Sequence, residues 1–275
     1  MKRLLRYFIS RTITNPNIIG WGVIFVLFWS FLGAYIIVGN FLKYIPQPYI
    51  NEVYPNYVAG WYADLIIISM SSIGVSIAYI LYFQTGTLPY LFRYSKLTPS
   101  SYLASMYLGL ISSSLIIELL LTLSVFLMFS NNGVGVIVAP ANIPYILLSL
   151  ILAGLFMISF SLFLVLLSLR LGGIRLQYFI NFIPLVLGYL FFSMFTFSEY
   201  PEILDYISPY LSLMLLFYYS YNGNIPPINI QSTQHIGSFE LVIFSILLWS
   251  FALILVDIYL MRKLYYRSIE EGRIY

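Results

Sequence analysis

The chain has no cysteine, a single histidine and few charged residues, and each scarcity excludes a class of protein. Without cysteine it is not a disulfide-stabilised secreted domain. One histidine leaves too few ligands for a zinc, haem or iron–sulfur site built from this chain alone. Only 8% of the 275 residues are charged, against roughly 25% in a soluble domain. This composition excludes an ordinary soluble enzyme, a disordered chain and a nucleic-acid binder.

Several catalytic motifs are missing from the sequence as well. There is no Gly-Lys dipeptide, so the chain lacks the phosphate-binding loop of P-loop ATPases. Neither His-Glu-x-x-His nor Gly-x-Ser-x-Gly occurs. We therefore predict that the chain is not an enzyme and holds no cofactor of its own. If ATP drives its activity, another chain must bind the ATP and Mg²⁺.

Hydrophobic residues, in contrast, make up 61% of the sequence, and the mean hydropathy is +0.91. Six apolar stretches are long enough for transmembrane helices, which need about 20 residues to cross a core about 30 Å thick. The sequence predicts an all-α integral membrane protein that forms a single transmembrane domain over residues 1–275. The predicted spans are 18–39, 61–83, 103–129, 143–169, 178–197 and 239–260.

The Lys and Arg residues predict the orientation of these spans. With six spans both termini lie on one side, and that side then carries 12 of the 13 Lys and Arg residues, all except Lys43. Basic residues concentrate on the cytoplasmic side of membrane proteins. We therefore predict a multi-pass protein of the plasma membrane with both termini in the cytoplasm.

The first 16 residues predict an amphipathic helix at the cytoplasmic membrane surface, because basic and apolar residues separate onto opposite faces. The basic face would contact lipid headgroups, whereas the simpler alternative is an orientation signal. The basic face comprises Lys2, Arg3 and Arg6, and the opposite face comprises Leu4, Leu5, Phe8 and Thr12.

Two connecting segments carry structural signals. In the cytoplasmic loop 84–102 we expect a short basic helix over 88–96 with Thr87 as its N-cap, and Thr98 followed by Pro99 predicts the start of the next helix. In the outer loop 198–238 the apolar run 207–221 is too short for a span, so we expect a re-entrant hairpin. The outer segment 40–60 contains three prolines and predicts a loop.

Apart from Glu240 at the start of the last predicted span, three acidic residues fall within the predicted spans. Ser114, Glu118 and Thr122 recur every four residues and form a polar stripe that should face protein or a water-filled cavity. The stripe is a candidate transport pathway or a helix-packing contact, and the packing role is favoured because no basic residue is predicted nearby. Asp64 and Asp257 lie nearer the span ends, where we expect them to reach interfacial water.

The order of these parts resembles the permease subunit of type-2 ABC transporters, most of which are exporters. Residues 86–100 read GTLPYLFRYSKLTPS, similar to the family's first cytoplasmic loop, in which a glycine is followed by a basic residue, Leu, Thr or Ser, and Pro. Residues 200–209 read YPEILDYISP, similar to the segment that precedes the family's sixth span. The resemblance covers the whole chain in architecture.

The resemblance implies a function and partners. The chain would form the substrate pathway of an ATP-driven exporter and bind a separate ABC ATPase subunit and a second, identical or homologous, permease subunit. Residues 88–96 would be the coupling helix that docks on the ATPase. Its contact residues would be Tyr90, Leu91, Arg93, Tyr94 and Lys96. A secondary transporter and a non-transporting subunit of a larger membrane complex remain alternatives.

Overall fold

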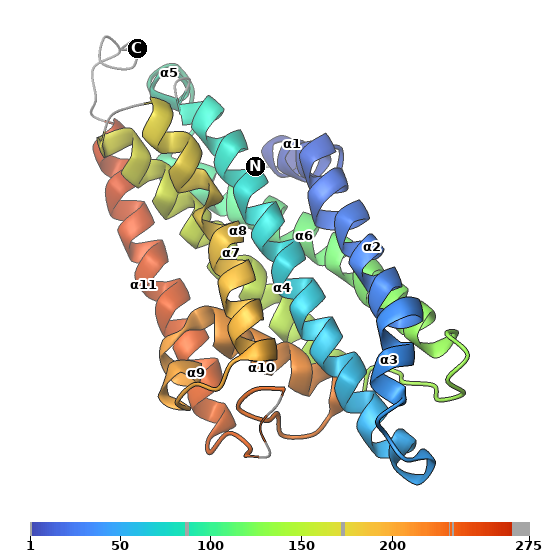
Figure 1. The fold of residues 1–275 in the computed structure, drawn as a ribbon. Helices are drawn as coiled ribbons and strands as arrows, with labels where there is room; N and C mark the ends of the chain where they lie inside the picture. The colour runs from blue at the N-terminus through green and yellow to red at the C-terminus, as the bar shows by residue number, and fades with distance from the viewer. Residues whose placement is uncertain (1, 86–87, 172–173, 231, 233, 266–275) are drawn as a thin grey trace.

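The computed structural model describes residues 2–85, 88–171, 174–230, 232 and 234–265. Helices dominate the described chain, and six of them are long and apolar enough to cross a membrane (Figure 1). This confirms the predicted all-α, multi-pass architecture. The six candidate spans are Ile18–Leu42, Gln47–Tyr82 in α4 with its lead-in, Pro99–Ser130 (α6), Ile143–Arg170 in α7, Phe179–Phe197 in α8 and Phe239–Lys263 in α11.

The helices of the fold follow the predicted order. The first span is built from two π-helical and two α-helical segments, η1, α2, η2 and α3. The bounds are α1 Lys2–Ile13, η1 Ile18–Ile24, α2 Phe25–Phe31, η2 Leu32–Ile37, α3 Val38–Leu42, η3 Gln47–Tyr49, α4 Ile50–Thr85, α5 Leu88–Tyr94, α6 Pro99–Ser130, α7 Ile143–Leu171, α8 Ile174–Phe197, α9 Ile203–Ile207, α10 Pro209–Asn222 and α11 Phe239–Tyr265.

The predicted outer loop 40–60 is wrong over its second half, because α4 already begins at Ile50. Pro55 lies inside α4 as its sixth residue, so the helix lacks the hydrogen bond that an N–H there would donate to the Asn51 carbonyl. Tertiary contacts hold this extension. The Tyr54 hydroxyl donates to the Phe129 carbonyl (2.7 Å), and the Tyr57 hydroxyl donates to the Gly33 carbonyl (2.9 Å).

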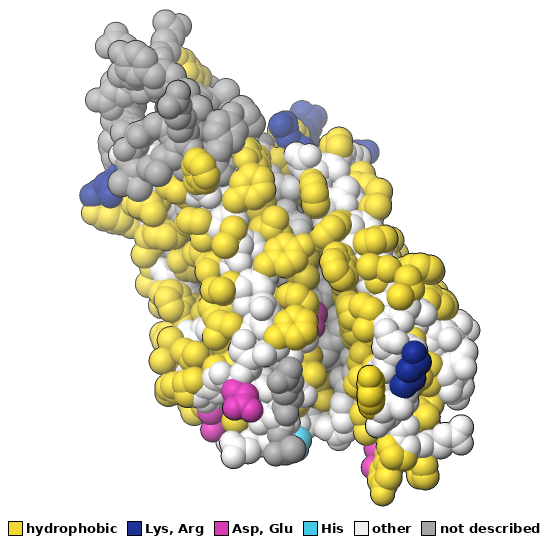
Figure 2. Space-filling model, viewed as in Figure 1, with side chains coloured by type: hydrophobic (Ala, Val, Ile, Leu, Met, Phe, Trp, Pro, Cys, Tyr) yellow, Lys and Arg dark blue, Asp and Glu magenta, His cyan; other side chains and the backbone are white. Residues whose placement is uncertain are grey.

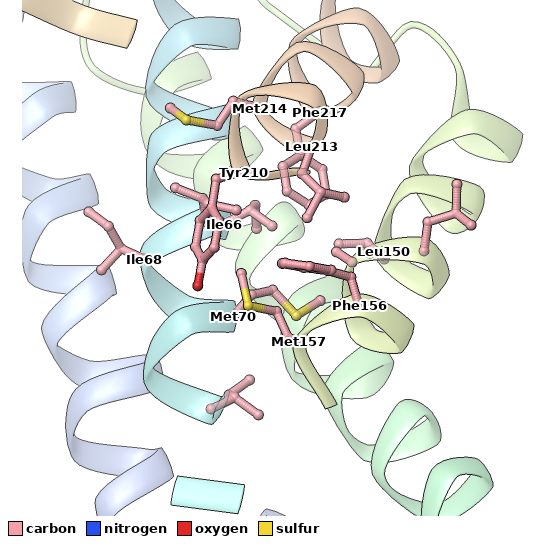
Figure 3. Close-up of a cluster of buried hydrophobic side chains, with 14 of the residues drawn as sticks. Ile66, Ile68, Met70, Leu150, Phe156, Met157, Tyr210, Leu213, Met214 and Phe217 are labelled. Atoms are coloured by element: carbon pink, nitrogen blue, oxygen red, sulfur yellow. The ribbon is translucent and has the colours of Figure 1, made fainter. Parts of the chain in front are cut away.

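Helix α4 forms the centre of the bundle and is the most buried of the six candidate spans, whereas α8 is the least buried. Helix α4 contacts α6, α7, α8, α10 and the first span. Figure 3 shows side chains from α4, α7 and α10 gathering in the core, among them Met70, Phe156 and Tyr210. The rings of Phe156 and Tyr210 meet edge to face with centroids 5.6 Å apart.

The segment between the last two spans contains two short helices, α9 and α10. The Ser208 hydroxyl accepts from the Leu211 N–H at the start of α10, Pro209 takes the first helical position, and Gly223 ends the helix with φ +79°. Helix α10 is buried on nearly every side by α4, α7 and α11. It therefore lies among the spans at the end of the bundle that carries α9, called here the α9 end (Figure 1).

Helix α1 lies at the opposite end, called here the α5 end, and packs against α6. Its predicted faces are confirmed, although the helix ends at Ile13 rather than residue 16. Phe8 and Thr12 are buried, whereas Lys2, Arg3 and Arg6 are exposed. Gly109 permits the close contact, because a Cβ there would lie 2.7 Å from the Phe8 Cβ.

Candidate functional sites at the α5 end and among the buried carboxyls

Helix α5 is fixed to the bundle by its apolar residues. Leu88 and Phe92 are buried, and the Phe92 ring meets Tyr102 of α6 edge to face with centroids 5.8 Å apart. Thr98 begins α6 with the predicted cap, since its side chain accepts from the Ser101 N–H while the Ser101 hydroxyl accepts from the Thr98 N–H. These contacts set the position of α5 at the end of the bundle. The predicted cap at Thr87 lies outside the described residues.

The outer face of α5 carries the residues predicted for coupling. Tyr94 is 74% exposed and Tyr90 is 41% exposed, and Arg93 is exposed between them. The Arg93 guanidinium lies over the Tyr94 ring, 5.8 Å from its centroid. The predicted helix 88–96 is too long, because α5 ends at Tyr94 and the exposed Lys96 lies in the turn that leads to Thr98. The Leu91 side chain lies outside the described part.

Basic side chains gather at the α5 end of the visible face (Figure 2). Exposed basic residues come from α1, from the segment around α5 and from the ends of α7 and α11. This clustering and the two exposed tyrosines make the α5 end a surface suited to an acidic protein partner with apolar pockets. The exposed residues are Lys2, Arg3, Arg6, Arg11, Arg93, Lys96, Arg170, Arg262 and Lys263.

Glu118 is fully buried and joins three parts of the bundle. The Ser69 Oγ of α4 lies 2.7 Å from Glu118 Oε1 and also 2.7 Å from the Gly22 carbonyl oxygen of the first span. A hydroxyl has one hydrogen and can donate to only one of these oxygens. Both contacts are satisfied when Glu118 carries a proton, donates to Ser69, and Ser69 donates to Gly22. The arrangement thus fits a neutral carboxyl that links helices.

The polar stripe of α6 faces protein, as predicted. Ser114, Glu118 and Thr122 are all buried. The Thr122 hydroxyl donates to the Glu118 carbonyl (2.8 Å) and lies 3.2 Å from the Tyr62 hydroxyl of α4. The Ser114 hydroxyl donates to the Ile111 carbonyl (3.0 Å) at the contact with α7. The stripe therefore lies in the contacts of α6 with α4 and α7.

Asp257 and Asp64 do not reach interfacial water, contrary to the prediction from their positions. Asp257 is fully buried, and its Oδ2 accepts from the Tyr107 hydroxyl (3.0 Å). Asp64 is 4% exposed, and its Oδ2 accepts from the Thr196 hydroxyl (3.1 Å). The neighbouring helices cover both carboxyls, and sequence position along a span does not reveal which helix face is covered.

The three carboxyls share one pattern. Each has one oxygen bonded to a hydroxyl of another helix and a second oxygen with no partner among the described residues. The Tyr107 hydroxyl also lies 3.1 Å from the Ser159 Oγ, and Ser159 donates to the Leu155 carbonyl. A proton on Asp257 would complete this chain of hydrogen bonds, as at Glu118. Sequence reasoning missed these hydroxyl partners, because they lie 49 to 150 residues away along the chain.

A second group of acidic residues lies at the α9 end, outside the candidate spans. The Tyr200 hydroxyl lies 2.6 Å from the Ile228 carbonyl oxygen and 3.1 Å from Asp205 Oδ1. Burial raises the pKa of Asp205 to about 7, although the Tyr200 hydrogen bond opposes the shift. Glu202 accepts from the Tyr206 hydroxyl and from the Gly237 N–H, and these bonds lower its pKa. The two carboxyls thus tie α9 to the segment before α11.

Neither the geometry nor the comparisons supply a direct identification. Within the described ranges, no three His, Asp or Glu side chains come together in a group that would hold a metal ion. Comparison of the chain with protein-family models, curated protein sequences and solved structures returned no match. The features that bear on function are the arrangement of the helices and the exposed face of α5.

Proposed function

We propose that the chain is the membrane-spanning permease subunit of a type-2 ABC exporter and works with an ATPase on a separate chain. The observation that supports the proposal most is α5, a short helix between the second and third spans that is anchored by Leu88 and Phe92 and exposes Tyr90, Arg93 and Tyr94. Exposed aromatic and arginine side chains are typical anchors of protein interfaces.

The rest of the fold agrees with the resemblance described above. Helix α1 precedes six candidate spans and packs on α6, and α9 and α10 lie between the last two spans at the opposite end. In this proposal the basic α5 end faces the cytoplasm of a cell with the protein in its plasma membrane. Two permease subunits and two ATPase subunits would form the transporter, and ATP and Mg²⁺ would bind the ATPase.

Copurification with an ATPase tests the proposal. A P-loop ATPase should copurify with the full chain when it is extracted from its native membrane. Tyr90→Ala with Tyr94→Ala should reduce the recovered ATPase by about tenfold or more, since truncating an interface aromatic often costs 2 kcal/mol or more. The matched control is Tyr44→Ala with Tyr49→Ala, because both tyrosines are exposed at the opposite end of the first two spans.

The two possible failures have different meanings. Absence of any ATPase in the wild-type sample would contradict the proposed function. Recovery of equal amounts with the α5 variant and the control variant would leave an ATPase-bound permease but would remove α5 as its docking element.

A further inference from the structure

Two polar side chains, one on α7 and one on α8, are buried without partners among the described residues. Asn181 of α8 is fully buried, and neither its amide oxygen nor its amide nitrogen has a hydrogen-bond partner in the described part of the chain. Ser161 of α7 is also fully buried, and its hydroxyl is unpaired within the same residues. Other buried serines of the spans, such as Ser72 and Ser168, instead donate to a carbonyl of their own helix.

A proline adds a third polar group next to Asn181. Pro184 lies inside α8 and has no N–H, so the Ile180 carbonyl loses its usual helical donor. The Pro184 carbonyl, in contrast, accepts from the Tyr210 hydroxyl of α10 (3.1 Å). The Ile180 carbonyl, without its usual helical donor, thus lies on the α5 side of Pro184, in the same turn as Asn181.

These groups lie along one helix contact, which we call the α8 seam and define by Gly74, Ser161, Asn181, Pro184 and Gly188. A Cβ built at Gly74 of α4 would lie 3.0 Å from the Ser161 Oγ and 3.5 Å from the Pro184 Cβ, so α4, α7 and α8 meet here. Asn181, Pro184 and Gly188 follow one another at helical spacing and are all buried, which places Asn181 on the same face of α8. No member of the seam carries a charge.

An unpaired amide lowers the stability of the folded protein in this environment. Burial of an amide or hydroxyl without a hydrogen bond costs about 1 to 3 kcal/mol by protein mutational data and more in a hydrocarbon-like interior. Asn181 contributes two donor hydrogens and an acceptor, Ser161 contributes one donor and an acceptor, and Ile180 contributes an acceptor. This set matches water, which donates and accepts and typically makes about three hydrogen bonds when buried. A cation or anion would lack a charged partner in the seam.

We propose that the α8 seam is a hydrated polar site inside the membrane-spanning bundle, in which Asn181 and Ser161 bind water. Asn181 lies about 3 Å inside the candidate span Phe179–Phe197, at 1.5 Å of rise per residue, so the site is near the α5 end of the spans. The small residues of the seam let α4 approach α8 closely, since a Cβ built at Gly188 would lie 2.9 Å from the Ser71 Cβ of α4. The inference is independent of an ATPase partner and goes beyond the proposed transport function.

Cysteine accessibility tests this site directly, because the chain contains no native cysteine. Ser161→Cys and Asn181→Cys would be purified as full chains in lipid nanodiscs and exposed to a small methanethiosulfonate reagent. The matched control is Ser105→Cys on α6. Ser105 is equally buried and donates to the Ser101 carbonyl (2.8 Å). It lies about 9 Å inside its candidate span, between the depths of Asn181 (about 3 Å) and Ser161 (about 14 Å) in theirs.

Only a thiolate reacts with this reagent, and a thiol ionises far more readily where water reaches it. We expect Ser161→Cys and Asn181→Cys to react at least about tenfold faster than Ser105→Cys. Ser161→Cys is the decisive variant, since it changes a single atom and should fold as the wild type does. If it reacts no faster than Ser105→Cys, the seam is dry and the proposal is wrong. The same result for a folded Asn181→Cys would also overturn it.

Discussion

Replacement of Glu118 by Gln tests whether this buried carboxyl is a neutral link between helices. The geometry places one hydroxyl, that of Ser69, at 2.7 Å from both Glu118 Oε1 and the Gly22 carbonyl oxygen. A glutamine can donate through its amide to Ser69, as a protonated glutamate would, while Ser69 donates to Gly22. Glu118→Gln should therefore retain the fold and change the free energy of unfolding by less than about 0.5 kcal/mol.

Ser69→Ala, which removes the Ser69 hydroxyl, should lower the free energy of unfolding more than Glu118→Gln does. Ser69→Ala loses both hydrogen bonds, and interhelical hydrogen bonds in membrane proteins contribute about 0.6 kcal/mol each on average, so we expect a loss of about 1 to 2 kcal/mol. In a Glu118→Leu background the same Ser69→Ala change should cost about 0.6 kcal/mol less, because only the bond to Gly22 remains.

Equilibrium unfolding in mixed micelles with increasing dodecyl sulfate provides the measurement. Ser113→Ala is the control, because the Ser113 hydroxyl is equally buried but bonds only to carbonyls of its own helix. A shift of more than about 2 kcal/mol in either direction for Glu118→Gln would refute the reasoning, since it would indicate a buried charge rather than a neutral carboxyl. Loss of transport with unchanged stability would instead assign Glu118 to the transport pathway.

Three further predictions concern other parts of the fold. Gly109→Ala should destabilise the protein by about 1 to 3 kcal/mol through overpacking against α1, whereas Gly20→Ala, where a Cβ meets nothing within 4 Å, should not. The raised pKa of Asp205 should make stability greatest below its ordinary pKa of 3.8 and diminish it as the pH rises through about 7. Thermal unfolding between pH 5 and pH 8, measured with wild type and Asp205→Asn, should show this dependence only in the wild type. A cysteine at the exposed Asn224 should react with an impermeant maleimide in intact cells, and one at the exposed Lys96 only after lysis; the reverse pattern would contradict the proposed orientation.

Local sequence signals predicted much of the fold. The six spans follow from continuous apolar runs, and the start of α6 follows from Thr98 and Pro99, whose cap needs only residues within one turn. The start of α10 is set by an equally local cap, Ser208 followed by Pro209, which was not predicted. The faces of α1 follow from the separation of basic and apolar residues.

Features that depend on distant residues were not predictable from one sequence. The early start of α4 depends on the bonds of Tyr54 and Tyr57 to carbonyls of α6 and η2, which outweigh the three prolines nearby. The burial of Asp257 depends on Tyr107, which precedes it by 150 residues. The unpaired amide of Asn181 became apparent only once α4, α7 and α8 were placed together.

The proposed coupling would require a mechanical link between α5 and α10, and α4 is the helix that contacts both. At 1.5 Å per residue its 36 residues extend about 54 Å, from the start of the α5 segment to the α9 end. There the Asn56 amide oxygen accepts from the Tyr218 hydroxyl (3.0 Å) and the Asn222 amide (2.7 Å), both on α10. Because α4 is also the most buried span, neighbouring helices resist its bending. We therefore expect a displacement of α5 to reach α10 through α4, which would move as a rigid rod.

The variant Asn56→Ala tests this coupling, because it changes neither α5 nor a buried carboxyl. That variant should retain ATPase binding but reduce the stimulation of ATP turnover by substrate, and unchanged stimulation would mean that the link runs through another helix.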